Sequence, residues 1–194
     1  MDDFVAIIAG RVAASRHVGR ADKNVVAFRA MFDAEYRGVL AYVLRRAPVS
    51  VADEIVADTF IVAWRKWARR PPPEEVRPWL FGIARRVLLN EQRAGRRRNA
   101  MRARLGAERP PAEPVIVGDV ALTQALAGLS ATDREVLRLT AWEELSTREI
   151  ATVLGCGEAA ARVRIHRARN RLRGALDARS SKTRPPETQR TGGA

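Results

Sequence analysis

Apolar residues recur every three or four positions along much of the chain, which is the spacing of amphipathic α-helices. Residues 25–47 show the first clear repeat, formed by Phe28, Phe32, Tyr36, Val39 and Val43. Pro48 follows, and proline cannot continue a helix. The pattern therefore predicts one helix that buries these five side chains.

A second helix is predicted over residues 50–67. Ser50 and Asp53 have the spacing of a capping box at its start. Its buried stripe is expected to consist of Val56, Phe60, Ala63, Trp64 and Trp67. Residues 68–77 contain three consecutive prolines and should form a stiff surface loop.

A third helix should begin at Pro78, because proline suits the first helical position. One side carries the apolar residues Leu80, Ile83, Ala84 and Val87. The other side carries the polar and basic stripe Arg86, Asn90, Arg93 and Arg97. Trp79 and Phe81 flank the apolar stripe, so each could pack in the core or stack on a nucleic-acid base.

Residues 99–118 contain three prolines and little periodicity, which is typical of a linker. A short helix is then expected over residues 119–129. Ser130 and Asp133 can cap the next helix, which should bury Val136, Leu137 and Leu139.

Residues 145–173 have the pattern of a helix-turn-helix. Ser146 and Glu149 form a capping box, and Leu145 can pack on Ile150 across the helix start. That helix should end near Leu154, where two glycines mark a sharp turn. The following helix should bury Ala161, Ile165, Ala168 and Leu172, and its opposite face then comprises Ala159, Arg162, Val163, His166 and Arg167.

Together these elements predict an all-α protein of two small helical domains joined by a flexible linker. We expect an extension over residues 1–24, a first domain over 25–98, a linker over 99–118 and a second domain over 119–177. Residues 178–194 are polar and rich in Pro, Gly, Ser and Thr, so a disordered tail is expected.

Charge points to a polyanionic partner. The formal net charge is +13, and lysine occurs only at Lys23, Lys66 and Lys182, so arginine supplies nearly all of the positive charge. Such an excess favours nucleic acid, with binding that weakens as salt rises. An arginine-rich helix can also be a solvated face, but a basic helix directly after a capped helix and a short turn favours DNA recognition.

Other classes of function are disfavoured. His17 and His166 are the only histidines and Cys156 is the only cysteine, so no catalytic triad or cysteine-based metal site is expected, and no cofactor. The chain has no long apolar span, and its first ten residues lack a basic leader. A cytoplasmic protein without a membrane segment is expected.

Three acidic residues stand out in so basic a chain: Asp53, Glu54 and Asp58 in the second predicted helix. Carboxylates near a helix N-terminus are favoured by the macrodipole, which explains them without any function. A docking face for a basic protein partner is the alternative. Spacing alone leaves both explanations open.

Three successive motifs resemble the sigma-70 family of bacterial RNA polymerase initiation factors, specifically the compact extracytoplasmic-function (ECF) group. Residues 53–64, DEIVADTFIVAW, are similar to region 2.2, and residues 77–93 are similar to regions 2.3 and 2.4. Residues 133–172 are similar to region 4. The resemblance covers residues 25–177, with the motifs in the family's order and a linker between them.

The resemblance implies an alternative sigma factor that binds core polymerase, recognises promoter DNA, helps to melt it and directs initiation. Asp53, Glu54 and Asp58 would bind the clamp helices of the largest subunit, and the region 4 domain would also contact the flap of the second-largest subunit. The loop over 68–77 and Trp79, Arg86, Asn90, Arg93 and Arg97 would open and hold the −10 element. The outward face of the last helix would bind the −35 element. An anti-sigma protein is a further implied partner.

Several positions depart from the family pattern. Ala57 stands where many relatives have Gln, and Arg86 where many have Asn. Ala159, Ala160 and Ala161 replace common Gly, Thr and Val, and Val163 replaces a small polar residue. Valine can contact a thymine methyl but cannot donate a hydrogen bond, so the −35 sequence cannot be transferred from relatives. A helix-turn-helix regulator acting without polymerase is the alternative function.

Overall fold

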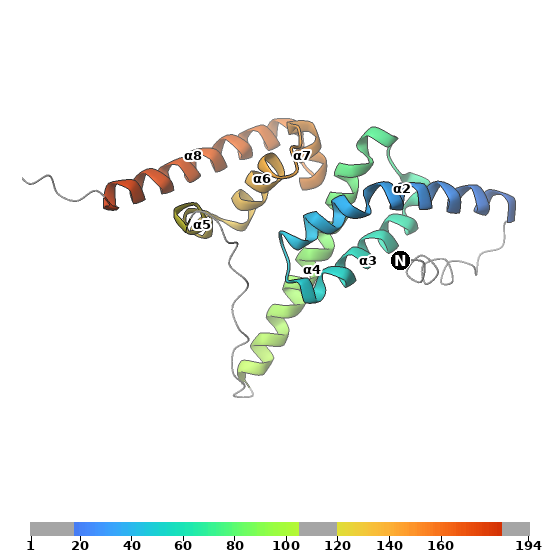
Figure 1. Ribbon diagram of the computed structural model, residues 1–194, viewed down its shortest axis with the longest axis horizontal. Helices are drawn as coiled ribbons and strands as arrows, with labels where there is room; N and C mark the ends of the chain where they lie inside the picture. The colour runs from blue at the N-terminus through green and yellow to red at the C-terminus, as the bar shows by residue number, and fades with distance from the viewer. Residues whose placement is uncertain (1–17, 105–119, 184–194) are drawn as a thin grey trace, which may run out of the picture. The chain divides into compact units, whose positions relative to one another are not determined.

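The computed structural model describes residues 18–104 and 120–183, and these residues are helical without β-strands (Figure 1). The predicted all-α class is confirmed. The helices form two compact units, the first with α2, α3 and α4, and the second with α5, α6, α8 and most of α7. The bounds are α2 Val18–Leu44, α3 Val49–Arg65, α4 Val76–Arg104, α5 Val120–Ala127, α6 Ala131–Ala141, α7 Thr147–Leu154 and α8 Glu158–Thr183.

The core of the first unit lies among α2, α3 and α4, as the periodicity predicts. Phe60 of α3 is fully buried, with ring centroids 4.6 Å from Phe32 and 6.5 Å from Phe28. Tyr36 and Trp64 belong to the same predicted stripes but are only half-buried at the edge of this core. Burial of several large rings is the main source of stability in such a small unit.

The start of α3 differs from the prediction. Its N-cap is Pro48, no side chain caps it, and Ser50 lies inside its first turn. Proline supplies the extended backbone that precedes a helix, with φ −58° and ψ 148°. The Pro48 carbonyl accepts from the Val51 N–H at 3.2 Å, so the helix begins one residue after the proline. At the other end α3 stops at Arg65, and Trp67 lies in the short 3₁₀ helix Trp67–Arg69, where it is still buried.

The helix α4 begins at Val76, two residues before the predicted start. Pro78 is tolerated there because the N–H groups of a first turn have no intrahelical partner. The buried side of α4 carries Leu80, Ile83 and Ala84 as predicted. Leu88 is buried where Val87 was expected, and Val87 is only half-buried.

Three predicted boundaries are wrong because the helices extend further than the sequence indicated. Residues 18–24 belong to α2, residues 99–104 continue α4, and residues 178–183 continue α8. Neither of the last two segments contains a glycine or proline that would end the helix. The remaining parts of the predicted extension, linker and tail, residues 1–17, 105–119 and 184–194, lie outside the described residues.

The second unit begins its helices as predicted. Ser130 accepts a hydrogen bond from the Asp133 N–H at 3.1 Å and caps α6. Ser146 and Glu149 form the reciprocal capping box of α7. The Ser146 N–H donates to Glu149 Oε2 at 2.8 Å, and the Glu149 N–H donates to Ser146 Oγ at 3.3 Å. Gly155 has φ +63°, a left-handed conformation that favours glycine, and it turns the chain into α8.

Candidate nucleic-acid and polymerase interfaces

One face of α8 is buried and the opposite face is exposed. Ala161 and Ala168 are fully buried and Ile165 is 8% exposed, whereas Leu172, also expected in the core, is half-buried. Val163 on the opposite face is 48% exposed. The face predicted to bind DNA is exposed throughout, and it comprises Ala159, Arg162, Val163, His166 and Arg167.

Two residues of that face contact their own helix. Arg162 forms an ion pair with Glu158 at 3.1 Å, with both side chains more than half exposed. His166 lies 3.4 Å from the Asn170 side-chain nitrogen. Exposed pairs of this kind contribute little to stability, so both side chains can exchange these partners for a nucleic acid at low cost.

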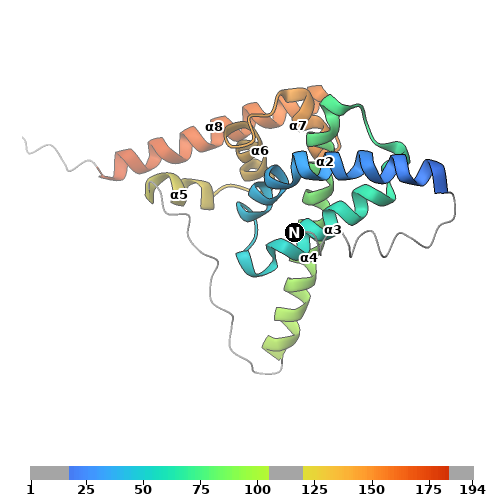
Figure 2. The same ribbon diagram turned by 45° about the vertical axis from the view of Figure 1, so that its right-hand side comes forward.

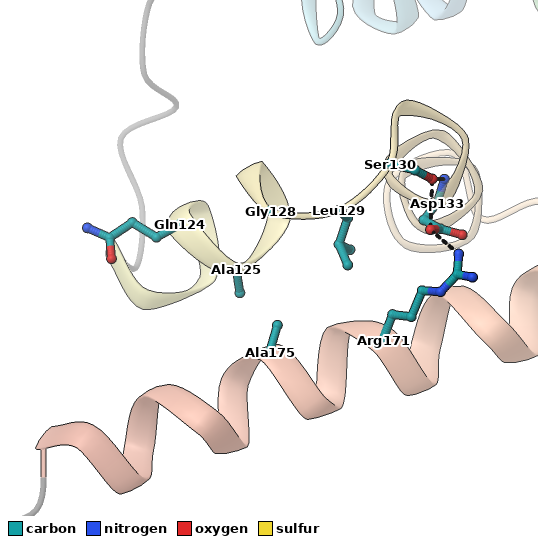
Figure 3. A pocket seen from close by; sticks show the side chains of 8 residues that line it. All are labelled: Gln124, Ala125, Gly128, Leu129, Ser130, Asp133, Arg171 and Ala175. Atoms are coloured by element: carbon teal, nitrogen blue, oxygen red, sulfur yellow. Dashed lines mark hydrogen bonds and ion pairs between the residues drawn. The ribbon is translucent and has the colours of Figure 1, made fainter.

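Arg171 has a different role, which the sequence did not reveal. It donates to Asp133 Oδ2 at 2.6 Å across 38 positions of sequence, and joins α8 to the start of α6 (Figure 3). Asp133 is only 6% exposed, and the Ser130 hydroxyl also donates to Oδ2 at 2.7 Å. We call Ser130, Asp133 and Arg171 the α6–α8 latch.

The latch sets the charge of Asp133. Burial acts to raise the pKa of this carboxyl, but the Ser130 hydrogen bond and the Arg171 guanidinium outweigh it and hold the pKa below its usual range. Asp133 is therefore ionised at neutral pH. A shallow pocket beside the latch is lined by Gln124, Ala125, Gly128, Leu129 and Ala175 (Figure 3).

Arg134 is also structural. Its guanidinium donates to the carbonyls of Ala127 and Leu129 at 2.9 Å and of Leu126 at 3.3 Å. These carbonyls lie at and just beyond the end of α5, where carbonyls lack the donor four residues further along a helix, although the Leu126 carbonyl also accepts from the Leu129 N–H at 3.1 Å. Arg134 thus ties the last turn of α5 to α6.

The basic stripe on α4 is exposed as predicted, at Arg86, Asn90, Arg93 and Arg97. Arg86 bends back and donates from Nε to the Gly82 carbonyl at 3.0 Å. Trp79, at the N-terminal end of the same helix, is half-buried and keeps part of its ring accessible.

Phe81 belongs to the core. It is 2% exposed and its ring stacks on Tyr42 at 4.7 Å with planes 12° apart. Of the two alternatives for this residue, core packing is therefore confirmed and stacking on a base is wrong.

The acidic residues Asp53, Glu54 and Asp58 are exposed on α3. Because α3 begins at Val49, its first turn contains no acidic residue. The helix macrodipole acts mainly within the first turn, so it does not account for carboxylates in the second and third turns. The structure thus weakens the explanation that needs no function and leaves an exposed acidic face.

Comparison with known proteins identifies the family. Residues 31–98 match the model of sigma-70 region 2, and residues 119–172 match the model of sigma-70, region 4. The ECF RNA polymerase sigma factor SigL of Mycobacterium tuberculosis is 30% identical over 172 residues, which cover 82% of this chain and 94% of the relative. This chain belongs to the ECF group of the sigma-70 family.

Other relatives and solved structures support the same family assignment. The sigma factor CnrH of Cupriavidus metallidurans is 34% identical over 153 residues, covering 70% of this chain and 78% of CnrH. The sigma factor RpoE of Bartonella quintana, solved with the anti-sigma factor NepR, has a TM-score of 0.59 at 26% identity, covering 78% of this chain and 97% of RpoE. A structure of CnrH with the cytosolic domain of CnrY has a TM-score of 0.55 at 27% identity, covering 90% of this chain and 98% of CnrH.

The protein is therefore an alternative sigma factor, which binds RNA polymerase and directs promoter recognition, DNA melting and initiation. The alternative function, a helix-turn-helix regulator acting without polymerase, gains no support. The chain matches the model of region 2 in addition to that of region 4. Within residues 18–104 and 120–183, no helix is long and apolar enough to cross a membrane.

Proposed function

We propose that this ECF sigma factor reads the −35 element with the outward face of α8. The observation that carries this is the exposure of Ala159, Arg162, Val163, His166 and Arg167 opposite the buried side of α8. In helix-turn-helix proteins the second helix enters the major groove, and the residues near its N-terminus contact base edges. Arg162 and Val163 are the base-reading residues, and Arg167 contacts phosphate.

The −10 element is held by α4. Opening the duplex costs a few kcal/mol for each unstacked base, which stacking and phosphate contacts must offset. Trp79 offers a partly accessible ring for stacking, and Arg86, Asn90, Arg93 and Arg97 offer charge and hydrogen bonds along the same helix. Residues 68–75, the part of the predicted loop that precedes this helix, take part in melting.

Asp53, Glu54 and Asp58 bind the clamp helices of the largest polymerase subunit, and the second unit also contacts the flap of the second-largest. Their exposure outside the first turn of α3 supports a role in docking. The protein acts in the cytoplasm, where it is also bound by an anti-sigma protein, and it performs no covalent chemistry and needs no cofactor or metal. A similar sigma factor has been solved with its anti-sigma factor, which supports this regulation.

Transcription with purified core polymerase tests the proposal. Transcript starts are first mapped after induced expression, and the promoters found are then transcribed in vitro. Exchange of Arg162 or Val163 should change the order of preference among −35 variants. Arg167→Gln should weaken all promoters alike and lower the slope of log affinity against log salt by about 1. Equal effects of all three substitutions on every promoter would contradict the assignment.

Core binding is tested separately. Asp58→Lys should weaken association with core polymerase, since it reverses one charge of the proposed docking face. Asp33→Lys is the matched control, because Asp33 is an exposed carboxylate of the same unit on α2. If both variants bind core polymerase equally well, α3 is not the docking face.

A further inference from the structure

An ion pair ties the start of α4 to α2. Arg77, the second residue of α4, donates from Nε to Glu35 Oε2 at 2.9 Å across 42 positions of sequence. Figures 1 and 2 show the N-terminal half of α4 lying against α2. The Glu35 side chain is 16% exposed, whereas the Arg77 side chain is 56% exposed. The carboxylate is therefore the fixed member of the pair, and the guanidinium extends from it into solvent.

The stability of α4 does not explain an arginine at this position. The N-terminus of a helix is the positive end of its macrodipole, so a cation in the first turn is disfavoured. Val76 and Pro78, on either side of Arg77, are buried and hold this turn in the core. An ion pair with one exposed member contributes little to stability. A negatively charged partner outside the protein accounts better for Arg77.

Arg77 is held by the middle of its side chain and not by its tip. Glu35 accepts from Nε, and among the residues that the structure describes neither terminal nitrogen of Arg77 has a partner. Arg171 of the latch differs, because it donates to its carboxylate from the terminal nitrogen Nη1. Arg86 is held as Arg77 is, from Nε, by the Gly82 carbonyl. A guanidinium held in this way keeps its terminal nitrogens free for the forked contact that arginine makes with phosphate.

The place of Arg77 on α4 selects a strand phosphate as its partner. Trp79, two residues further along, offers the ring that stacks on an unstacked base in the proposed function. Proteins that hold single strands combine such rings with cations that follow the backbone. Residues two apart on a helix point to different sides. Arg77 and Trp79 can therefore contact the backbone and a base of one strand without competing for space.

We propose that Glu35 is a positioning residue for the melted −10 strand: it fixes Arg77 before DNA arrives, so that the terminal nitrogens of Arg77 bind a phosphate. The proposal deepens the proposed role of α4 in −10 recognition and rests on it. It gives a function to α2, which contributes none of the DNA contacts proposed above. Glu35 itself does not contact DNA, and its effect passes through Arg77 alone.

Removal of Glu35 distinguishes positioning from plain electrostatics, because the two effects have opposite signs. Deleting a carboxylate makes the protein more positive, and by charge alone this strengthens binding to nucleic acid. Loss of positioning weakens binding, since Arg77 must then be ordered as the strand binds. Glu35→Ala should therefore bind the strand about 2- to 12-fold more weakly, the cost of immobilising one long side chain. Glu35→Gln should restore most of the affinity, because its amide oxygen can still accept from Nε.

The measurement uses holoenzyme assembled from core polymerase and the full chain. The probe is the non-template −10 strand of a promoter found by transcript mapping, and its affinity is measured between about 50 and 200 mM salt. Arg77→Ala should lower the slope of log affinity against log salt by about 0.7, the value for one phosphate of a single strand. Glu35→Ala should lower the affinity at a nearly unchanged slope.

Asp33→Ala is the matched control for charge. Asp33 is an exposed carboxylate of the same helix and makes no ion pair with the described residues. Its removal changes the net charge as Glu35→Ala does, so it should leave strand binding unchanged or strengthen it slightly. If Glu35→Ala strengthens binding as much as Asp33→Ala, the carboxylate acts only as charge and the proposal is wrong.

Two combined variants test whether the pair merely holds α2 and α4 together. In an Arg77→Ala background, Glu35→Ala should have no further effect on strand binding. Glu35→Arg combined with Arg77→Glu keeps opposite charges on the two helices but presents a carboxylate to the strand, so it should not restore binding. Restored binding would overturn the proposal, as would faster hydrogen exchange of α3 in Glu35→Ala. Failure of the wild-type holoenzyme to bind the strand would instead contradict the proposed function of α4.

Discussion

Breaking the α6–α8 latch should loosen the second unit without removing a DNA contact. The perturbation is Arg171→Gln, which deletes the guanidinium that binds Asp133 at 2.6 Å. Its partner Asp133, whose side chain is 9% exposed, is then left with the Ser130 hydroxyl and no counter-charge. The reciprocal change, Asp133→Asn, keeps the shape of the side chain and removes its charge.

The magnitude follows from burial on the two sides of the pair. Removing one partner from a fully buried pair costs about 3 to 5 kcal/mol, and exposed pairs contribute about 0 to 1 kcal/mol. The Asp133 side chain is 9% exposed but the Arg171 side chain is 58% exposed, so solvent screens the pair from one side. We therefore expect each single substitution to cost about 1 to 2 kcal/mol, which lies between the two limits.

Hydrogen exchange in α6 and α8 is the appropriate assay, because a chain of two units does not unfold in one two-state transition. Arg171→Gln and Asp133→Asn should both speed exchange in α6, and the double variant should cost less than the sum of the two. Arg173→Gln, an exposed arginine two residues further along α8, is the control. If Arg171→Gln weakens DNA binding as much as Arg167→Gln and leaves α6 exchange unchanged, the latch has been misassigned.

The latch also has a pH signature. The pKa of the Asp133 carboxyl is lowered in the folded state. Asp133 therefore contributes stability at pH values above its unfolded pKa of about 3.9, and this contribution is lost as pH falls toward the folded pKa. The difference in α6 stability between wild type and Asp133→Asn should be full at neutral pH and shrink below about pH 4.

Three further predictions concern single side chains. Phe60→Ala should destabilise the first unit by about 3 to 5 kcal/mol, because Phe60 is fully buried against Phe28 and Phe32. Hydrogen exchange in α3 measures this loss. A loss of stability smaller than that caused by Leu44→Ala, at an exposed position of α2, would contradict the prediction. Ser146→Ala should cost about 1 kcal/mol in α7 by removing the acceptor of the Glu149 N–H, and Ser146→Asp should restore most of it, since aspartate also caps helices. Trp79→Ala should slow promoter opening and destabilise the unit less than Phe81→Ala, because Trp79 is half-buried and Phe81 is fully buried; the reverse order would exchange their roles.

The core stripes could be predicted from the sequence because the apolar periodicity of a helix is set by residues that are close together in the sequence. Phe28, Phe32, Phe60 and Leu80 are buried as expected, and the second unit has the capping predicted from Ser130 and Ser146. The helix ends were harder to predict. Ser50 has the spacing of a capping residue, but Pro48 starts the helix earlier, and two local signals in conflict cannot be ranked from spacing alone.

Contacts between distant segments were beyond prediction. Nothing local distinguishes Arg171 from Arg169 or Arg173, and its partner lies 38 residues away. The same limit applies to Phe81, whose core position depends on Tyr42 in another helix. Packing between helices decides the roles of both residues.

The arginines of α8 therefore cannot be treated as one basic surface. Arg171 neutralises a buried carboxylate, Arg162 pairs loosely with Glu158 on an exposed face, and Arg167 is exposed on the same side as Val163. A residue that holds the helix in place must be bound before DNA arrives, whereas a residue that reads bases must be able to leave its partner. Burial of the partner carboxylate separates these two cases, since the Asp133 side chain is 9% exposed and the Glu158 side chain is 51% exposed. In the proposed function, Arg171 therefore orients α8, and the orientation of that helix determines which bases Arg162 can reach.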